Sequence, residues 1–166
     1  MRPLTEDDVR ASFVNASPDE LRIVALPTDF LLADWDHLDF FAWRDPRTRG
    51  RGYVIAEIDG DVRGVVLRSA DGTSRARSAM CDLCHTTQPA DQVTLFTARK
   101  AGEAGEHGDS VGRYICADLS CHENVRLAMP LAPNEVRASV DRRIDGTRRR
   151  TEAFVERVVE TAGSRR

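Results

Sequence analysis

The sequence predicts an α+β fold in which a small antiparallel sheet is flanked by helices. Two β-branched runs, residues 53–58 and 62–68, lie on either side of Asp59-Gly60-Asp61, and this pattern is typical of a β-hairpin. Capping signals near the N-terminus and apolar residues spaced four apart near the C-terminus predict the helices. The chain has 166 residues, which is enough for a single domain with a core of its own.

Two short helices are predicted near the N-terminus. Residues 6–14 follow Thr5, which can cap the helix, and Asp8 completes a capping-box pattern. The next helix begins after Ser17, with Pro18 at its first position.

The centre of the chain is predicted to hold the sheet. Asp45-Pro46 indicates the turn that ends the first strand, and the Gly-, Glu- and Asp-rich residues 101–110 are expected to form a mobile hairpin loop. The predicted strands are residues 38–43, 53–58, 62–68, 93–98 and 112–116.

Further helices are predicted after the last strand. One begins near Leu119 and continues to about Leu127, before Pro130 ends it. Two C-terminal helices are expected within residues 134–162, and Asp145-Gly146 is predicted to separate them.

Composition excludes several classes of protein. With 41% hydrophobic residues, 31% charged residues and a net charge of −3, the chain is neither disordered nor strongly basic. It contains no apolar run long enough to cross a bilayer, so a membrane partner is not expected. Residues 1–8 are acidic and lack the apolar core of a signal peptide, which predicts a cytoplasmic location.

Four cysteines form the clearest motif, with the pattern Cys81-x2-Cys84 followed by Cys116-x4-Cys121. Two close pairs in a reducing compartment favour a metal over disulfides or four unrelated thiols. Four sulfur ligands suit one tetrahedral Zn²⁺ and leave no open position for water, so the zinc is predicted to be structural. The order of knuckle, hairpin and helix is that of a treble clef, and it predicts a zinc finger over residues 78–129.

Two histidines beside the cysteines are further candidate ligands. His85 and His122 each follow a cysteine and could replace one as ligand, but we expect them to lie outside the coordination shell. The sequence contains no phosphate-binding loop, nucleophile elbow or zinc-protease motif, so an enzyme is not expected.

Several segments together resemble one known family. They are Leu38–Pro46, Cys81–Cys84, Val93–Arg99 and Gly112–Cys121. The chain resembles the C-terminal treble-clef zinc-finger domain of the elongation factor G-binding, fusidic-acid-resistance (FusB-like) proteins. The resemblance runs from about Leu4 to the C-terminal helices, so residues 1–166 are interpreted as a single domain of this type. The resistance proteins also carry a separate N-terminal helical bundle, which no part of this sequence resembles.

The resemblance implies a zinc-dependent protein that binds elongation factor G and helps it leave the ribosome, with fusidic acid tolerance as a consequence. Contact with the ribosome would then be indirect or transient. On the finger hairpin we expect one cationic patch beside an aromatic ring, although Phe96 and Tyr114 could instead be hairpin core and the charges solvated surface. The candidate contact residues are Phe96, Arg99, Lys100, Arg113 and Tyr114.

A zinc module that binds RNA or the ribosome directly is the alternative. It would act through a C-terminal arginine cluster, because arginine side chains pair with phosphates. A helix with many arginines is more often a solvated face, which makes this the second interpretation. The cluster consists of Arg142, Arg143, Arg148, Arg149 and Arg150.

Overall fold

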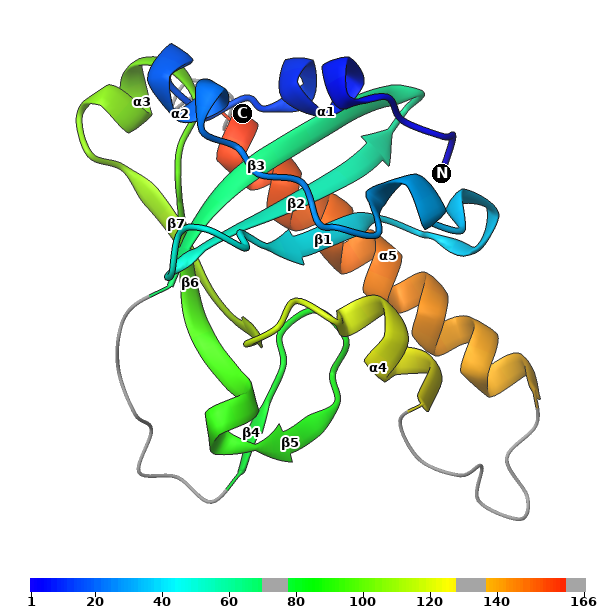
Figure 1. Cartoon of the computed structure of the whole chain (residues 1–166). Helices are drawn as coiled ribbons and strands as arrows, with labels where there is room; N and C mark the ends of the chain where they lie inside the picture. Colours follow the sequence, from blue (N-terminus) through cyan, green and yellow to red (C-terminus); the bar gives the residue numbers. More distant parts are fainter. Residues whose placement is uncertain (70–77, 128–136, 161–166) are drawn as a thin grey trace.

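The computed structural model of the chain describes residues 1–69, 78–127 and 137–160. A five-stranded antiparallel sheet forms its centre, in the order β1-β2-β3-β6-β7. The long helix α5 crosses one face, while α1 and the N-terminal segment lie on the other (Figure 1). The strands are β1 (Phe41–Arg44), β2 (Arg51–Ile58), β3 (Asp61–Ser69), β6 (Val93–Arg99) and β7 (Ser110–Cys116).

The predicted N-terminal helices and central hairpin are confirmed. Helices α1 (Glu6–Ser12) and α2 (Pro18–Arg22) both begin with a capping box. Between β2 and β3, Asp59 and Gly60 have φ angles of 53° and 86°. Two positive φ values in a two-residue turn match the right-handed twist of the flanking strands, so the Asp-Gly pair closes the hairpin.

The N-terminal segment continues into two 3₁₀ turns, η1 (Phe30–Leu32) and η2 (Trp35–His37). These turns precede β1, which begins three residues later than the strand predicted from Leu38.

Around the cysteines, β4 (Ser78–Met80) and β5 (Thr87–Pro89) form a small second sheet. The 3₁₀ turn η3 (Ala90–Gln92) connects it to β6, and α4 (Cys121–Leu127) follows β7. The structure therefore has the predicted α+β architecture with a treble-clef arrangement of knuckle, hairpin and helix.

The predicted loop at residues 101–110 is wrong in part, because the short helix α3 (Gly102–Glu106) forms there. The segment is held against the rest of the fold, since the Ala101 N–H donates to the Val158 carbonyl at 2.8 Å. A Cβ on Gly105 would lie 1.8 Å from the carbonyl oxygen of Lys100. Only glycine allows this close approach of helix and chain.

The predicted break at Asp145-Gly146 is also wrong, since α5 (Arg137–Val159) is one continuous helix. Glycine inside a helix costs only about 1 kcal/mol, and tertiary packing exceeds that cost. Phe154, Val155 and Val158 are each no more than 1% exposed against the sheet. Pro130 and the start of the predicted 134–162 segment lie outside the described residues.

The two faces of the sheet carry two separate cores. Alternation along β2 directs Tyr53 and Ile55 toward an aromatic core with α1, while Val54 and Ala56 point toward α5. All four cysteines belong to the second core, beside the same β2 and β3 side chains that contact α5. The metal site is thus continuous with the main core. In the described part of the chain, no helix is long and apolar enough to span a membrane.

Candidate metal centre

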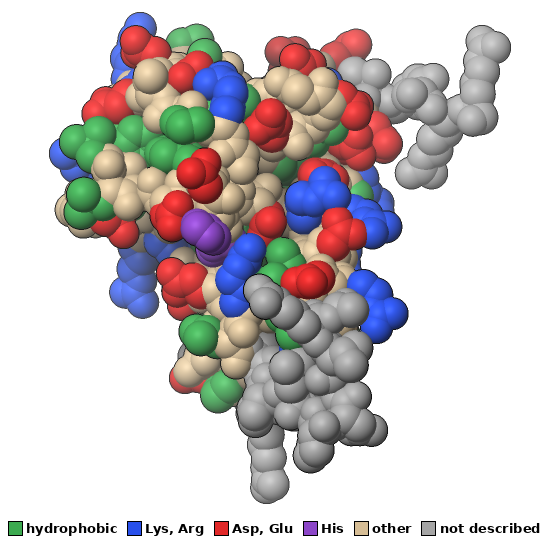
Figure 2. All heavy atoms as spheres, turned by 90° about the vertical axis from the view of Figure 1, so that its right-hand side faces the viewer, with side chains coloured by type: hydrophobic (Ala, Val, Ile, Leu, Met, Phe, Trp, Pro, Cys, Tyr) green, Lys and Arg blue, Asp and Glu red, His purple; other side chains and the backbone are tan. Residues whose placement is uncertain are grey.

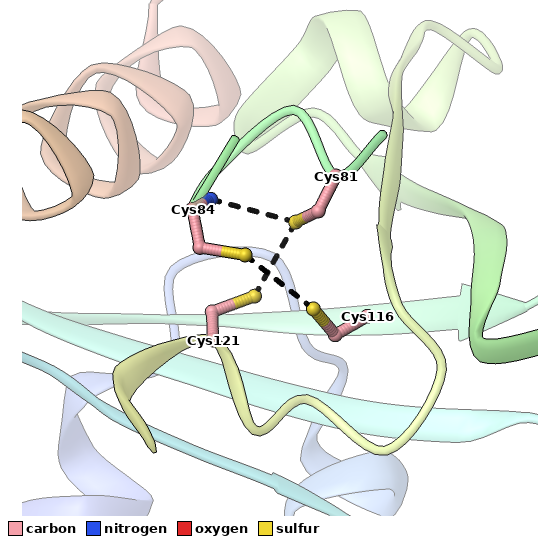
Figure 3. A group of neighbouring side chains, drawn as sticks. All are labelled: Cys81, Cys84, Cys116 and Cys121. Atoms are coloured by element: carbon pink, nitrogen blue, oxygen red, sulfur yellow. Dashed lines mark hydrogen bonds between the residues drawn. The ribbon is translucent and has the colours of Figure 1, made fainter. Parts of the chain in front are cut away.

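The four cysteine sulfurs converge on one point inside the protein (Figure 3). All four residues are buried, and their Sγ atoms lie within 4.8 Å of one another. The Sγ atoms of Cys81 and Cys121 are 3.5 Å apart, and those of Cys84 and Cys116 are 3.6 Å apart. A tetrahedron with Zn–S bonds near 2.3 Å has S–S edges of about 3.8 Å, so the cluster fits Zn²⁺.

The first pair is presented by a tight knuckle after β4. The backbone N–H groups of Leu83 and Cys84 point at the Cys81 sulfur, at 3.4 and 3.5 Å. His85 then turns the chain back with a φ of 57°, and its N–H donates to the Cys81 carbonyl at 2.9 Å. Backbone N–H groups directed at a sulfur stabilise its thiolate form, which is the form that binds metal.

The second pair converges across a longer spacer. Cys116 ends β7, and Leu119 takes a φ of 65° while its N–H donates to the Cys116 carbonyl at 2.9 Å. This turn brings Cys121, in the first turn of α4, back over the end of the strand. The N-terminal end of α4 carries partial positive charge, which favours a thiolate there.

Three side chains outside the ligand set support the cluster. Gln88 and Asn124 donate side-chain N–H groups to the Cys116 sulfur at 3.3 and 3.4 Å. Arg150, which reaches across from α5, donates its Nε–H to the Leu83 carbonyl inside the knuckle at 2.6 Å. Asn124 lies three residues after Cys121, so helical spacing could have indicated it, whereas Gln88 and Arg150 leave no signal in the sequence.

The buried thiols need a cation. The hydrogen bond with Cys116, the other neighbouring thiols and burial together raise the pKa of Cys121 well above its ordinary value in the metal-free cluster. A divalent ion removes this obstacle because it neutralises the thiolates as they form.

A comparison with protein families agrees with this geometry. The family described as the FBP C-terminal treble-clef zinc-finger matches residues 8–158. The chain belongs to this family. No curated protein and no solved structure matches the chain. Membership of the FBP C-terminal family and the four clustered cysteines establish one structural Zn²⁺, held by Cys81, Cys84, Cys116 and Cys121.

Neither neighbouring histidine joins this zinc site. His85 is exposed, and the Nδ1 of His122 lies 3.6 Å from the Asp39 carboxylate. Burial opposes ionisation of Asp39, but hydrogen bonds from His122 and Arg126 outweigh it and lower the pKa of Asp39. These contacts anchor α4 to the segment before β1. Four sulfurs fill the coordination shell of the zinc, and no fifth ligand lies within reach among the described residues. The zinc site therefore has no open position and is structural.

The predicted contact residues on the finger hairpin do not form one patch. Phe96 is 0% exposed, so it belongs to the core and is unavailable to a partner. Arg113 pairs in register with Phe96 and lies on the α5 face. Tyr114 is 55% exposed and lies on the face of the sheet opposite to Arg113, because successive strand residues point to opposite faces.

The other two candidates are tied into the fold. Arg99 shares the face of Tyr114 and bonds the Glu20 carboxylate at 3.4 Å. The Lys100 ammonium donates to the Glu160 carbonyl at 3.2 Å. The predicted patch assumed that nearby strand positions face the same way, and the register shows that they do not.

Arg113 instead faces two arginines of α5, Arg150 and Arg157. Together with Asp82 and Leu83 of the knuckle they line a hollow of about 370 Å³, called here the basic hollow. Among the described residues, neither Arg113 nor Arg157 has a carboxylate partner. The hollow lies directly beside the zinc knuckle, so the metal fixes its position.

The remaining C-terminal arginines lie elsewhere on α5. Arg148 pairs with Asp145 and Glu152, both at 2.7 Å, and Arg149 also pairs with Asp145. The guanidinium of Arg142 donates to the Ser139 hydroxyl at 3.3 Å. These ion pairs reduce the free positive charge of the predicted arginine cluster.

Proposed function

We propose that this protein is a zinc-dependent binding protein of the cytoplasm, and not an enzyme, which docks onto elongation factor G and promotes its release from the ribosome. Its membership of the FBP C-terminal family supports this proposal most directly, because FusB-like proteins bind that factor. Tolerance of fusidic acid would follow from faster release of the stalled factor.

The basic hollow is the docking surface that we favour. It joins the knuckle to the edge strand β7, since Asp82 and Tyr114 exchange two hydrogen bonds of 2.7 and 2.8 Å. The ring of Tyr114 points to the other face of β7 and does not line the hollow, so the arginines, which are common anchors of interfaces, would provide the main contacts. Unpaired guanidinium groups in the hollow would attract carboxylates of an acidic partner and accelerate encounter.

Charge reversal of the hollow tests the proposal. Arg113→Glu combined with Arg157→Glu should slow association with purified elongation factor G by roughly tenfold at low salt, because steering by exposed charges is lost. Zinc content and melting temperature should stay close to wild type. Biolayer interferometry gives the rates, and release of the factor from fusidic acid-stalled ribosomes gives the functional consequence.

The matched control also discriminates against RNA binding. Arg142→Glu with Arg149→Glu changes the same charge on α5 outside the hollow, and it should leave the factor's association rate unchanged. If this control instead abolishes ribosome binding while the hollow variant behaves as wild type, the protein is an RNA-binding module and the proposal fails.

A further inference from the structure

A second surface lies on the opposite edge of the sheet from β7. The edge strand β1, the segment of residues 27–38 and the start of α4 enclose a groove of about 590 Å³, called here the β1 groove. Figure 2 shows the side of the molecule that carries the segment before β1, with hydrophobic side chains gathered beside acidic ones on its upper left. Neither the zinc ligands nor the basic hollow contribute to the lining.

The first relevant property of the β1 groove is an open backbone edge. The Asp45 N–H donates to the Arg51 carbonyl at 3.0 Å, so Asp45 and Arg51 form a hydrogen-bonded pair. Hydrogen-bonded and non-hydrogen-bonded pairs alternate along an antiparallel ladder, so every second residue of β1 bonds to β2. Ala42 lies between two such pairs, so its N–H and C=O point away from β2. Within the described ranges, no hydrogen bond to these two groups of Ala42 is formed, and an extended segment could bond to them.

The second property is apolar surface. Leu38 and Ala42 are half-buried apolar members of the lining, and together with Phe40 and Leu119, which are only 1% and 2% exposed, they form its floor. Leu32 also belongs to the lining and is 85% exposed, and its chain neighbour Leu31 is 88% exposed. Large exposed apolar side chains beside a groove mark sites of protein contact.

The third property is charge. Asp29, Asp118 and Glu123 line the groove and are exposed, and within residues 1–69, 78–127 and 137–160 none of them has a basic partner. The guanidinium of Arg44 lies over the Phe96 ring, 5.1 Å from its centroid, and donates to the Ser69 hydroxyl at 3.2 Å. The rim is therefore negative, and it would repel the phosphates of a nucleic acid.

We propose that the β1 groove binds an extended segment of a partner protein in which lysine or arginine alternates with apolar residues, and that this segment adds as a strand to β1. Alternation places the apolar side chains on the floor and the basic ones against the acidic rim, because side chains on a strand point to opposite sides in turn. This site is independent of elongation factor G binding at the basic hollow.

A peptide library tests the proposal directly on the zinc-loaded protein. Heptapeptides with lysine or arginine at odd positions and valine, isoleucine, leucine or phenylalanine at even positions should contain members that bind with a dissociation constant of roughly 0.1 mM or tighter. The same library with glutamate at the odd positions should not bind. Fluorescence anisotropy measures the affinity. In NMR spectra of the protein, the amide chemical shifts that change on peptide binding should be confined to β1, residues 27–38 and α4.

Two variations locate the contacts. Asp29→Lys with Glu123→Lys should weaken the best peptide by roughly tenfold, since both rim charges are reversed. The control Glu156→Lys with Glu103→Lys makes the same change in charge on α5 and α3, and should have no effect. Methylating alternate backbone nitrogens of the peptide should also abolish binding, because strand addition needs those donors.

Three results would overturn the proposal. They are the absence of any binder in the basic library, equal binding to the rim variant and its control, and a dimer held together through β1 in size-exclusion chromatography. The last result would mean that a second copy of the chain occupies the groove.

Discussion

Arg150 gives the sharpest test of how the zinc knuckle is held in place. Its guanidinium joins α5 to the Leu83 carbonyl, which lies between the two ligands of the first cysteine pair, at 2.6 Å. Leu83 is itself 2% exposed, so the carbonyl has little access to water if the bond is lost. Replacing Arg150 by methionine keeps much of the side-chain volume and removes the donor.

The expected loss follows from this geometry. A hydrogen bond from a charged group contributes about 1.5–3 kcal/mol, so Arg150→Met should lower the free energy of unfolding by about 2 kcal/mol. For a chain of this size that corresponds to a fall in melting temperature of roughly 4–8 °C. Outer partners of metal ligands typically change metal affinity by about 10- to 100-fold, so the affinity for zinc should fall as well.

Arg149→Met is the matched control. The Arg149 side chain is 71% exposed and pairs with Asp145 one helical turn away. Such a pair contributes only about 0.3–0.5 kcal/mol. Thermal unfolding followed by circular dichroism gives stability, and competition with a chromogenic chelator gives zinc affinity. Equal behaviour of the two variants in both assays would refute the role assigned to Arg150.

Three further predictions follow from the core and the turns. Cys116→Ser should lose zinc in native mass spectrometry and should lower the melting temperature of the whole chain, because the cysteine cluster shares a core with β2 and β3. Proteolysis that stays confined to residues 78–129 would contradict this. Gly105→Ala should cost about 1–3 kcal/mol in urea unfolding, since its Cβ meets the Lys100 carbonyl. Gly112→Ala is the control, because Gly112 has no positive φ and the added Cβ meets nothing nearer than 3.4 Å. Tyr53→Phe should cost about 2 kcal/mol, because the Tyr53 hydroxyl donates to the Asp45 carboxylate at 2.5 Å. Burial opposes ionisation of Asp45, but hydrogen bonds from Tyr53 and from backbone N–H groups outweigh it and lower the pKa of Asp45. The resulting contribution to stability is complete above the ordinary carboxyl pKa of about 4 and is lost only below it. A difference in stability between wild type and Tyr53→Phe that changes from pH 7 to pH 5 would therefore disprove the assignment.

The sequence alone determined the features that depend on short spacings. Both capping boxes, the Asp59-Gly60 turn and the knuckle at Cys81 and Cys84 are set by residues within three or four positions of one another. The choice of all four zinc ligands was also predictable, because the chain contains only two close cysteine pairs. Local sterics and hydrogen bonding decide such features before the chain folds as a whole.

Only the tertiary structure decided which side chains meet across the sheet. Strand register separates Arg113 from Tyr114 and Arg99, and it places Arg113 opposite Arg150 and Arg157. Register depends on pairing between segments, and a shift of one residue would reverse every face.

The continuity of α5 through Gly146 has a similar origin. Burial of Phe154, Val155 and Val158 against the sheet outweighs the local preference of Asp-Gly for a turn. Asn15 shows the same dependence, since its side chain bonds the backbone of Val66 and Arg99, which are 51 and 84 residues away. Contacts at such separations are decided by the packing of the whole chain, and no local pattern encodes them.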